Sequence, residues 1–288
     1  MSKKKFNRAG LIGSLVFGLV VAGCGSDASG EKGDLEIVYV ERDSEVASTY
    51  VIGQVLEEAG YDVTLTGIDN ALMWEAIANG EADGMVSAWL PLTMKAQYEA
   101  YADQVVELGP NLEGAKLGLV VPEYMEVNSI EDLSKEADQN IIGIDPGAGV
   151  MDAAANAVEE YDNLEGWTVQ TSSSGAMATE LRRAYEEEDE IIVTGWTPHW
   201  KFQEYDLKYL DDPGGVFGEA ETIETIVRKD LEEDAPEAYQ ILDNFYWEPE
   251  DIEEVMLAMN EGAFPEDAAA DWIEANQDKV AEWTEGIE

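Results

Sequence analysis

Two tryptophans, Trp89 and Trp196, occupy the same place in two similar stretches of the chain, and each precedes a proline by two residues. The tryptophans are 107 residues apart, as are Pro91 and Pro198. An indole face carries negative π density, and each desolvated cation–π contact contributes up to about 2 kcal/mol. Two such faces suit a quaternary ammonium ion, whose methyl groups need apolar walls. The pair therefore predicts a site for a cation. We interpret the other tryptophans as core residues: Trp74, Trp167, Trp200, Trp247, Trp272 and Trp283.

A glycine-rich turn at 147–150 offers the complementary chemistry. It lies between a predicted strand at 141–144 and a predicted helix that runs from Val150 to about Glu160. The free N–H groups and the dipole of a helix N-terminus favour a carboxylate. A Gly-x-Gly turn is weak evidence on its own. Beside two indoles, however, Gly149 and Val150 complete a site for a zwitterion with a cationic head and a carboxylate tail.

Strand-like and helix-like segments alternate along the chain, and the pattern occurs twice, at about 35–121 and about 141–227. Such alternation predicts open, mainly parallel α/β sheets, in which ligands bind at the carboxyl ends of strands. Two copies predict two lobes that present Trp89 and Trp196 to each other across a cleft. The largely helical stretch 235–288 is expected to pack back on the first lobe.

The composition excludes several classes of function. The 288 residues include 63 acidic and 16 basic side chains, for a formal net charge of −47, and this field repels nucleic acids and anionic bilayers. One His and one Cys leave little for metal sites, disulfides or His-based catalysis. Neither G-x-S-x-G nor H-E-x-x-H occurs. We therefore expect no enzyme, no metal and no other cofactor, and we interpret His199 as a structural residue that makes hydrogen bonds.

The acidic surface has two interpretations. Cation binding would need carboxylates clustered in loops such as D-x-D-x-D-G, which the chain lacks. Adaptation to high salt fits better, because dense carboxylates keep a protein hydrated while screening removes their mutual repulsion. The acidic runs at 186–190 and 248–254 are expected to form solvated helix faces or loops.

The first residues have the pattern of a secretory signal. Lysines at 3–5 precede an apolar run at 11–22, which is too short to span a bilayer. The run ends in Val-Ala-Gly before Cys24, and this resembles the lipobox of bacterial lipoproteins. The resemblance implies removal of residues 1–23 and a diacylglycerol on the Cys24 sulfur. Residues 24–33 then form a flexible tether, and the body is held by lipid on the extracytoplasmic side of the cell membrane.

Over essentially its whole length the chain resembles the glycine betaine-binding lipoproteins of osmoprotectant ABC importers. The stretches that carry the resemblance lie at 43–49, 85–91, 143–149, 172–177 and 194–200. The family implies a type II periplasmic-binding-protein fold, in which two α/β lobes on a hinge close on a ligand. It places Trp89 and Trp196 around the ammonium, and the backbone amides of Gly149 and Val150 at the carboxylate.

Two positions depart from the family pattern. A third Trp usually precedes the Asp-Ser-Glu motif, where this chain has Arg42, and a His usually stands where this chain has Met94. Arg42 either lies against an indole, reaches the carboxylate in place of the missing His, or turns outward. The departures leave the ligand open among glycine betaine, carnitine, proline betaine, a sulfonium zwitterion and ectoine.

These observations predict lobe 1 at 34–120 and 229–288 and lobe 2 at 121–228, with the hinge near 120–122 and 226–228. The expected partners are a small zwitterion, an ABC permease and its ATPase, with membrane contact through a lipid anchor only and no nucleic acid. We expect a monomer. The alternatives from other classes are an extracytoplasmic enzyme and a sensory or adhesion lipoprotein of the same fold.

The net charge gives a first testable prediction. Self-repulsion among the carboxylates destabilises the fold at low ionic strength, and added salt screens it. The melting temperature of the purified protein is therefore expected to rise as KCl increases from dilute buffer into the molar range. A flat or falling curve in a thermal scan would remove the high-salt interpretation.

Overall fold

The computed structural model describes residues 32–287. The predicted signal sequence at 1–23, the Cys24 lipidation site and most of the 24–33 tether lie outside the described residues. The strands are β1 (Asp34–Tyr39), β2 (Asp62–Gly67), β3 (Gly84–Leu90), β4 (Val105–Pro122), β5 (Asn140–Ile142), β6 (Thr168–Gln170), β7 (Ile192–Thr197), β8 (Leu207–Tyr209) and β9 (Glu221–Arg228). The α-helices are α1 (Asp43–Glu58), α2 (Asn70–Asn79), α3 (Lys95–Tyr101), α4 (Gly149–Glu160), α5 (Ser174–Glu187), α6 (Lys201–Glu204), α7 (Leu231–Asp234), α8 (Pro236–Asn244), α9 (Pro249–Asn260), α10 (Pro265–Ala275) and α11 (Gln277–Trp283).

The strands form one path in the order β2-β1-β3-β9-β4-β7-β5-β6, and β8 also pairs with β4. We call the part from β2 to the first half of β4 the first sheet, and the rest the second sheet. Three strands in each sheet are parallel to one another, namely β1, β2, β3 and β5, β6, β7. The strands β4, β8 and β9 pair antiparallel. The expectation of a mainly parallel arrangement is therefore wrong, and the sheets are mixed.

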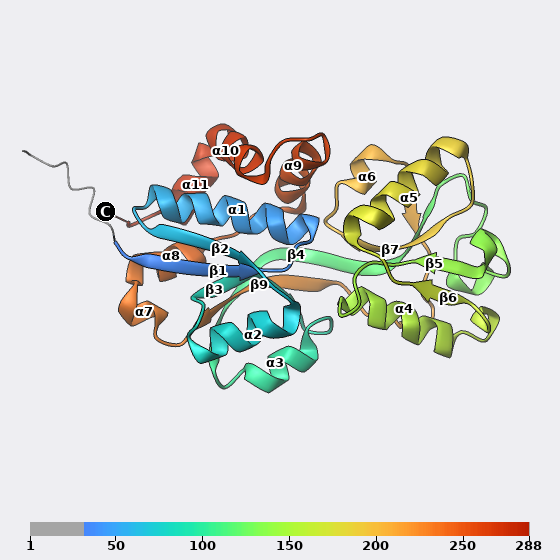
Figure 1. Ribbon diagram of the computed structural model, residues 1–288, viewed down its shortest axis with the longest axis horizontal. Helices are drawn as coiled ribbons and strands as arrows, with labels where there is room; N and C mark the ends of the chain where they lie inside the picture. Colours follow the sequence, from blue (N-terminus) through green and yellow to red (C-terminus); the bar gives the residue numbers. More distant parts are fainter. Residues whose placement is uncertain (1–31, 288) are drawn as a thin grey trace, which may run out of the picture. The chain divides into compact units, whose positions relative to one another are not determined.

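The strand β4 belongs to both sheets and runs between them (Figure 1). Its residues up to Ala115 pair with β9, and from Lys116 onward they pair with β7. The pairing also places β9 beside β3 in the first sheet. This disagrees with the predicted lobe boundaries, which left 116–120 in the first lobe and put 221–228 in the second. The 18 residues of β4 form one strand, and the change of partner follows a register shift between Glu113 and Ala115, where Gly114 has a φ of 81°.

Helices cover both sheets (Figure 1). In the first sheet, α1 contacts β1, β2 and β3, and α9 and α10 pack on the outer side of α1. The C-terminal helices thus pack back on the first part of the chain, as the sequence predicts. Helices α2 and α3 contact each other on the opposite face, and α4 contacts β6 and β7 of the second sheet.

The tryptophans interpreted as core residues are buried. Trp247, Trp272 and Trp283 form one aromatic cluster with Phe245 in the C-terminal region. Trp272 stacks on Trp283 with ring centroids 5.7 Å apart, and Trp247 meets Trp272 edge to face at the same separation. This cluster fixes α10 and α11 against α8 through burial of large apolar surface.

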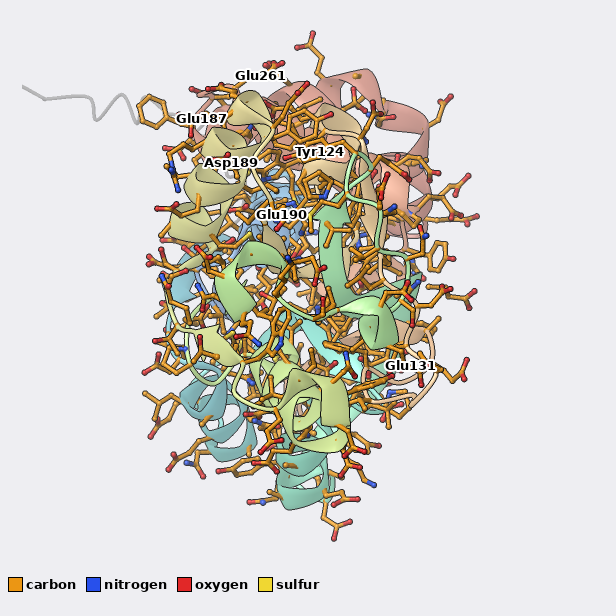
Figure 2. The ribbon with its side chains drawn as sticks, turned by 90° about the vertical axis from the view of Figure 1, so that its right-hand side faces the viewer. Tyr124, Glu131, Glu187, Asp189, Glu190 and Glu261 are labelled. Carbon is orange, nitrogen blue, oxygen red and sulfur yellow. The ribbon has the colours of Figure 1, made fainter. Side chains whose placement is uncertain are left out.

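The surface carries the excess acid. All five residues of the run at 186–190 are exposed, and Figure 2 shows carboxylates of Glu187, Asp189 and Glu190 around the end of α5. The run at 248–254 differs in one respect, because Asp251 is buried. Its carboxylate accepts the backbone N–H of Glu248 at 2.8 Å and pairs with Lys279. The interpretation of that run as wholly solvated is therefore wrong at Asp251, which closes the N-terminus of α9.

Candidate functional site

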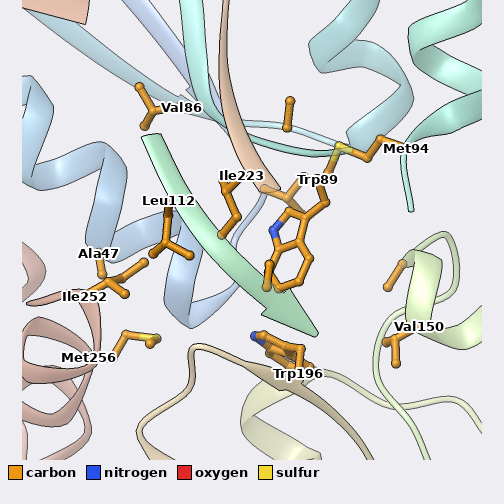
Figure 3. Close-up of a cluster of buried hydrophobic side chains, with 14 of the residues drawn as sticks. Ala47, Val86, Trp89, Met94, Leu112, Val150, Trp196, Ile223, Ile252 and Met256 are labelled. Atoms are coloured by element: carbon orange, nitrogen blue, oxygen red, sulfur yellow. The ribbon is translucent and has the colours of Figure 1, made fainter. Parts of the chain in front are cut away.

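Trp89 and Trp196 are each the second-last residue of a strand, β3 and β7. They are 5% and 4% exposed, and each is followed by a cis peptide bond before its proline. Figure 3 shows the indole of Trp89 extending toward Trp196, with Val150 to one side of the space between them. The structure thus brings together the two residues that the internal repeat singled out.

A cavity of about 40 Å³ lies between these indoles and α4. All six residues proposed from the sequence as ligand contacts line it. The lining consists of Arg42, Ser44, Glu45, Asn70, Trp89, Thr93, Met94, Leu117, Ile144, Ala148, Gly149, Val150 and Trp196.

The N-terminus of α4 opens onto this cavity. The helix begins at Gly149, one residue before the predicted start, and no described carbonyl or side chain accepts from the N–H groups of Gly149 and Val150. These donors and the helix dipole favour an anion. Gly149 also lies against Thr93, which is on the side of the cavity that the first sheet forms. A Cβ at Gly149 would come within 2.4 Å of the Thr93 Cγ2 and 3.1 Å of the Thr93 carbonyl oxygen.

Arg42 lines the cavity, but its guanidinium is engaged by two carboxylates. Its Nη1 donates to Glu45 at 3.0 Å, while its Nη2 and Nε donate to Asp145 at 2.7 and 3.3 Å. Asp145 follows the second sheet's β5, whereas Arg42 and Glu45 stand at the start of α1 beside the first sheet. The guanidinium therefore joins the two sides of the cavity, and the outward orientation, one of the three alternatives for Arg42, is not observed.

Sequence reasoning missed Glu45 and Asp145 as partners of Arg42. Glu45 is buried, accepts the backbone N–H of Val40 at 3.0 Å, and has its pKa raised by desolvation, which Arg42 opposes. The spacing of Arg42 and Glu45, three residues apart at a helix start, was an available signal. Nothing comparable in the sequence connects Arg42 with Asp145, 103 residues away.

Met94 occupies the position where the family pattern has a His. It is buried, its backbone N–H donates to the Trp89 carbonyl at 3.0 Å, and its side chain lies beside Trp89 (Figure 3). The preceding segment is held by Glu221, whose carboxylate accepts the N–H groups of Leu92 and Thr93 at 2.6 and 2.8 Å. Met94 thus supplies apolar wall where a His would supply a hydrogen-bond donor.

Behind Trp196 lies a second, fully buried group of side chains. The ring of His199 meets Trp196 edge to face at 4.7 Å, and its Nδ1 accepts the backbone N–H of Lys201 at 3.1 Å. Burial, and next the charge of Lys201, hold the pKa of His199 well below its usual value, so the imidazole is neutral. The accepted bond at Nδ1 fits the interpretation of His199 as a structural residue, while its buried Nε2 has no hydrogen-bond partner among the described residues.

Within residues 32–287, no cluster of three or more His, Cys, Asp or Glu side chains is arranged to hold a metal ion. No helix in the same range combines the length and apolar character that crossing a bilayer requires.

Comparison with known proteins matches most of the chain to one family. The family model described as the substrate-binding domain of ABC-type glycine betaine transport system matches residues 33–275. The glycine betaine/carnitine transport binding protein GbuC of Listeria monocytogenes is 54% identical over 159 residues, which make up 55% of this chain and 53% of that protein. The alignment thus spans about half the length of this curated relative.

Solved structures agree over nearly all the described residues. Lactococcal OpuAC, in its closed-liganded conformation with glycine betaine, is 52% identical with a TM-score of 0.85, covering 88% of this chain and 100% of that one. An ABC-transporter choline binding protein in complex with choline is 26% identical with a TM-score of 0.80, covering 88% of this chain and 92% of that one. These matches confirm the periplasmic-binding-protein fold that the sequence predicts.

The buried ion pair of Arg42 with Glu45 gives a prediction for stability. Removing one partner of a buried pair costs about 3–5 kcal/mol, because the other charge is left unpaired. In Arg42→Met the pKa of Glu45 rises further, so the folded state keeps a proton that the unfolded state releases, and stability falls as pH rises between those two pKa values. We expect the loss in free energy of unfolding to be larger at pH 8 than at pH 5.

Urea unfolding of wild type and variant at both pH values measures this difference. Arg183→Met is the matched control, because Arg183 is exposed and pairs only with Glu180 and Glu187 on its own helix. It should change the free energy of unfolding by less than about 1 kcal/mol at either pH. An equal loss at pH 5 and pH 8 in Arg42→Met would show that Glu45 is not the charge left uncompensated.

Proposed function

Because the chain belongs to the substrate-binding domains of ABC-type glycine betaine transport systems, we propose that it captures glycine betaine outside the cytoplasm and delivers it to an ABC permease. The observation that carries this proposal is the cavity that Trp89 and Trp196 line together with the free N-terminus of α4. It offers π faces for a cation and N–H donors for an anion, which are the two needs of a betaine.

The cationic head goes to the indoles. A trimethylammonium group has no N–H to donate, so it gains little from carboxylates or carbonyls and much from aromatic faces and apolar contact. Trp89 and Trp196 supply the faces, and Met94, Leu117 and Ile144 supply apolar surface around them.

The carboxylate goes to α4. The unpaired N–H groups of Gly149 and Val150 can donate hydrogen bonds to a carboxylate without help from a charged side chain. The helix dipole adds to this attraction. Arg42 retains two unused N–H groups out of five, one on each terminal nitrogen. Contact between Arg42 and the ligand carboxylate therefore stays a prediction. The observed role of Arg42 is to join the two sides of the cavity.

The ligand can also be a relative of glycine betaine. Carnitine, proline betaine, a sulfonium zwitterion and ectoine remain the alternatives with an anionic end. Choline is the second candidate, because the Arg42 guanidinium faces two carboxylates, Glu45 and Asp145, and the local charge is compatible with a ligand that lacks an anionic end. A choline-binding relative of the same fold points the same way.

The remaining expectations complete the proposed role. We propose that a diacylglycerol on Cys24 anchors the protein on the extracytoplasmic side, with residues 24–33 as the tether. The protein works as a monomer with an ABC permease and its ATPase, and it takes no part in catalysis. The acidic surface fits import of a compatible solute by an organism that lives in high salt.

Capture is proposed to close two lobes about a hinge. The strand pairing supports crossing segments at Ala115–Lys116 within β4 and between β8 and β9, at about 210–220. These replace the segments expected near 120–122 and 226–228. A hinge of this kind concentrates the change in backbone dihedrals in a few residues where the two sheets meet.

Replacement of the indoles tests the proposal. Trp89→Ala and Trp196→Ala should each weaken glycine betaine binding by about 1–3 kcal/mol, through loss of cation–π attraction and buried aromatic area. Calorimetric titration at high salt should show this as an increase in Kd of roughly one to two decades. The same titration against the alternative solutes and choline identifies the preferred ligand.

Trp283→Ala is the control for these variants. Trp283 is buried in the C-terminal aromatic cluster and does not line the cavity. Provided that circular dichroism shows the variant to be folded, its affinity should equal that of the wild type. Equal losses in all three variants would mean that Trp89 and Trp196 act through packing and that the cation site lies elsewhere.

The anionic end is tested by a glycine pair. Gly149→Ala places a Cβ against Thr93 and shifts the N–H donors, and overpacking of this kind costs about 1–3 kcal/mol. Glycine betaine should bind correspondingly more weakly, and choline should lose less. Gly175→Ala, in the first turn of α5 with open space at its Cβ, should leave both affinities unchanged. Equal losses for betaine and choline in Gly149→Ala would place the carboxylate away from α4.

A further inference from the structure

Lys201 is a buried cation that the proposed binding scheme does not use. It is the first residue of α6, it is 0% exposed, and no described group accepts a hydrogen bond from its Nζ. The ammonium instead lies over the indole of Trp196, 4.3 Å from the ring centroid, and 5.3 Å from the ring of Phe202. A buried ammonium without acceptors is costly, so its position against Trp196 calls for an explanation.

The two faces of Trp196 serve different neighbours. Trp196 lines the cavity and Lys201 does not, so the ammonium lies on the indole face turned away from the cavity. Val120 and the Lys201 Cε lie beside Gly195, and the ring of His199 meets the indole of Trp196 edge to face. A ligand's ammonium on the cavity face would therefore share one indole with the ammonium of Lys201.

We propose that the charge of Lys201 weakens the binding of a quaternary ammonium on the opposite face of Trp196, which makes Lys201 a positioning residue that sets affinity through this indole. The inference rests on the proposed function, because it needs a cationic head at Trp196. With cation–π distances near 4.5 Å on each face, the two charges are roughly 9 Å apart across the ring. In the buried surroundings of the site such repulsion corresponds to a change in Kd on the order of tenfold.

The geometry also allows the charge of Lys201 to change. Burial lowers the pKa of Lys201 to about 7, although the more distant carboxylates of Asp43 on α1 and Glu253 on α9 raise it. His199, which contacts the same indole, is neutral. The remaining charges around the cavity are Arg42, Glu45 and Asp145, which are bound to one another.

Binding and protonation are then linked. A ligand cation lowers the pKa of Lys201 further, so binding releases a proton and affinity rises with pH. The Kd for glycine betaine and for choline should fall about fivefold between pH 6 and pH 8.5. Calorimetry near pH 6.5, in two buffers of different ionisation enthalpy, should detect release of about half a proton per ligand.

Two substitutions separate the charge of Lys201 from its shape. Lys201→Met keeps the length without the charge and should bind at pH 6 as tightly as the wild type does at pH 8.5. Lys201→Arg keeps the charge at every pH and should bind weakly throughout. Lys135→Met is the control, because Lys135 is exposed and lies outside the cavity lining. Its pH profile should match that of the wild type.

Three results would overturn the inference. The first is a wild-type Kd that is independent of pH, with no proton released. The second is a Lys201→Met variant that keeps the pH dependence, which would assign it to another group such as Glu45. The third is a Lys201→Met variant that binds more weakly at pH 6 than the wild type.

A measurement without ligand separates this inference from the proposed function. In protein labelled with ¹³C at lysine, the resonance that disappears in Lys201→Met should titrate near pH 7. Titration above pH 9 would overturn the inference whatever the protein binds. If neither glycine betaine nor choline bound any variant at any pH, the proposed function would fail, and the inference would fail with it.

Discussion

The site depends on a single strand that is hydrogen-bonded into two sheets. Along β4, Leu112 pairs with Ile223 of β9, which in turn pairs with Trp89, while Leu117 pairs directly with Trp196. The ladder bonds therefore fix each indole relative to its own half of β4, at registers five residues apart, with the proposed hinge at Ala115–Lys116 between them. Because both tryptophans lie at the ends of their own strands, these walls of the cavity are held by the strand pairing. The loops that follow the strands supply other residues of the cavity lining.

The charges at the site differ in how their desolvation is offset. Arg42 is buried with two carboxylates that accept its hydrogen bonds in a forked geometry, which suits a permanent cation. No described group accepts a hydrogen bond from the Nζ of Lys201, and this ammonium lies over an aromatic ring. A guanidinium cannot lose its proton in such a place, whereas an amine can. Arg42 thus holds the two sides of the cavity together, whereas Lys201 is the side chain whose charge can change.

The sequence predicted the parts of the site whose signal is local. The repeated Trp-x-Pro turns located Trp89 and Trp196, and the turn before a helix located Gly149 and Val150. What it could not supply were relations between distant segments. The bond from Arg42 to Asp145 depends on how the sheets are placed, and the change of partner within β4 depends on which strands lie beside it. The burial of Asp251 in an acidic run is of the same kind, since a capping carboxylate and a solvated one look alike in sequence.

The contact between Arg42 and Asp145 has a consequence for the proposed closure. It joins the two sides of the cavity through protein groups alone, so it favours the closed arrangement whether or not a ligand is bound. A permease that recognised only a closed shape would then also engage unloaded copies. Because the Asp145 side chain is about one-third exposed, this bond is open to screening by salt, unlike the buried bond to Glu45. High salt would therefore raise the fraction of ligand-free molecules in the open arrangement. The ligand-free and ligand-bound forms would then differ more in conformation.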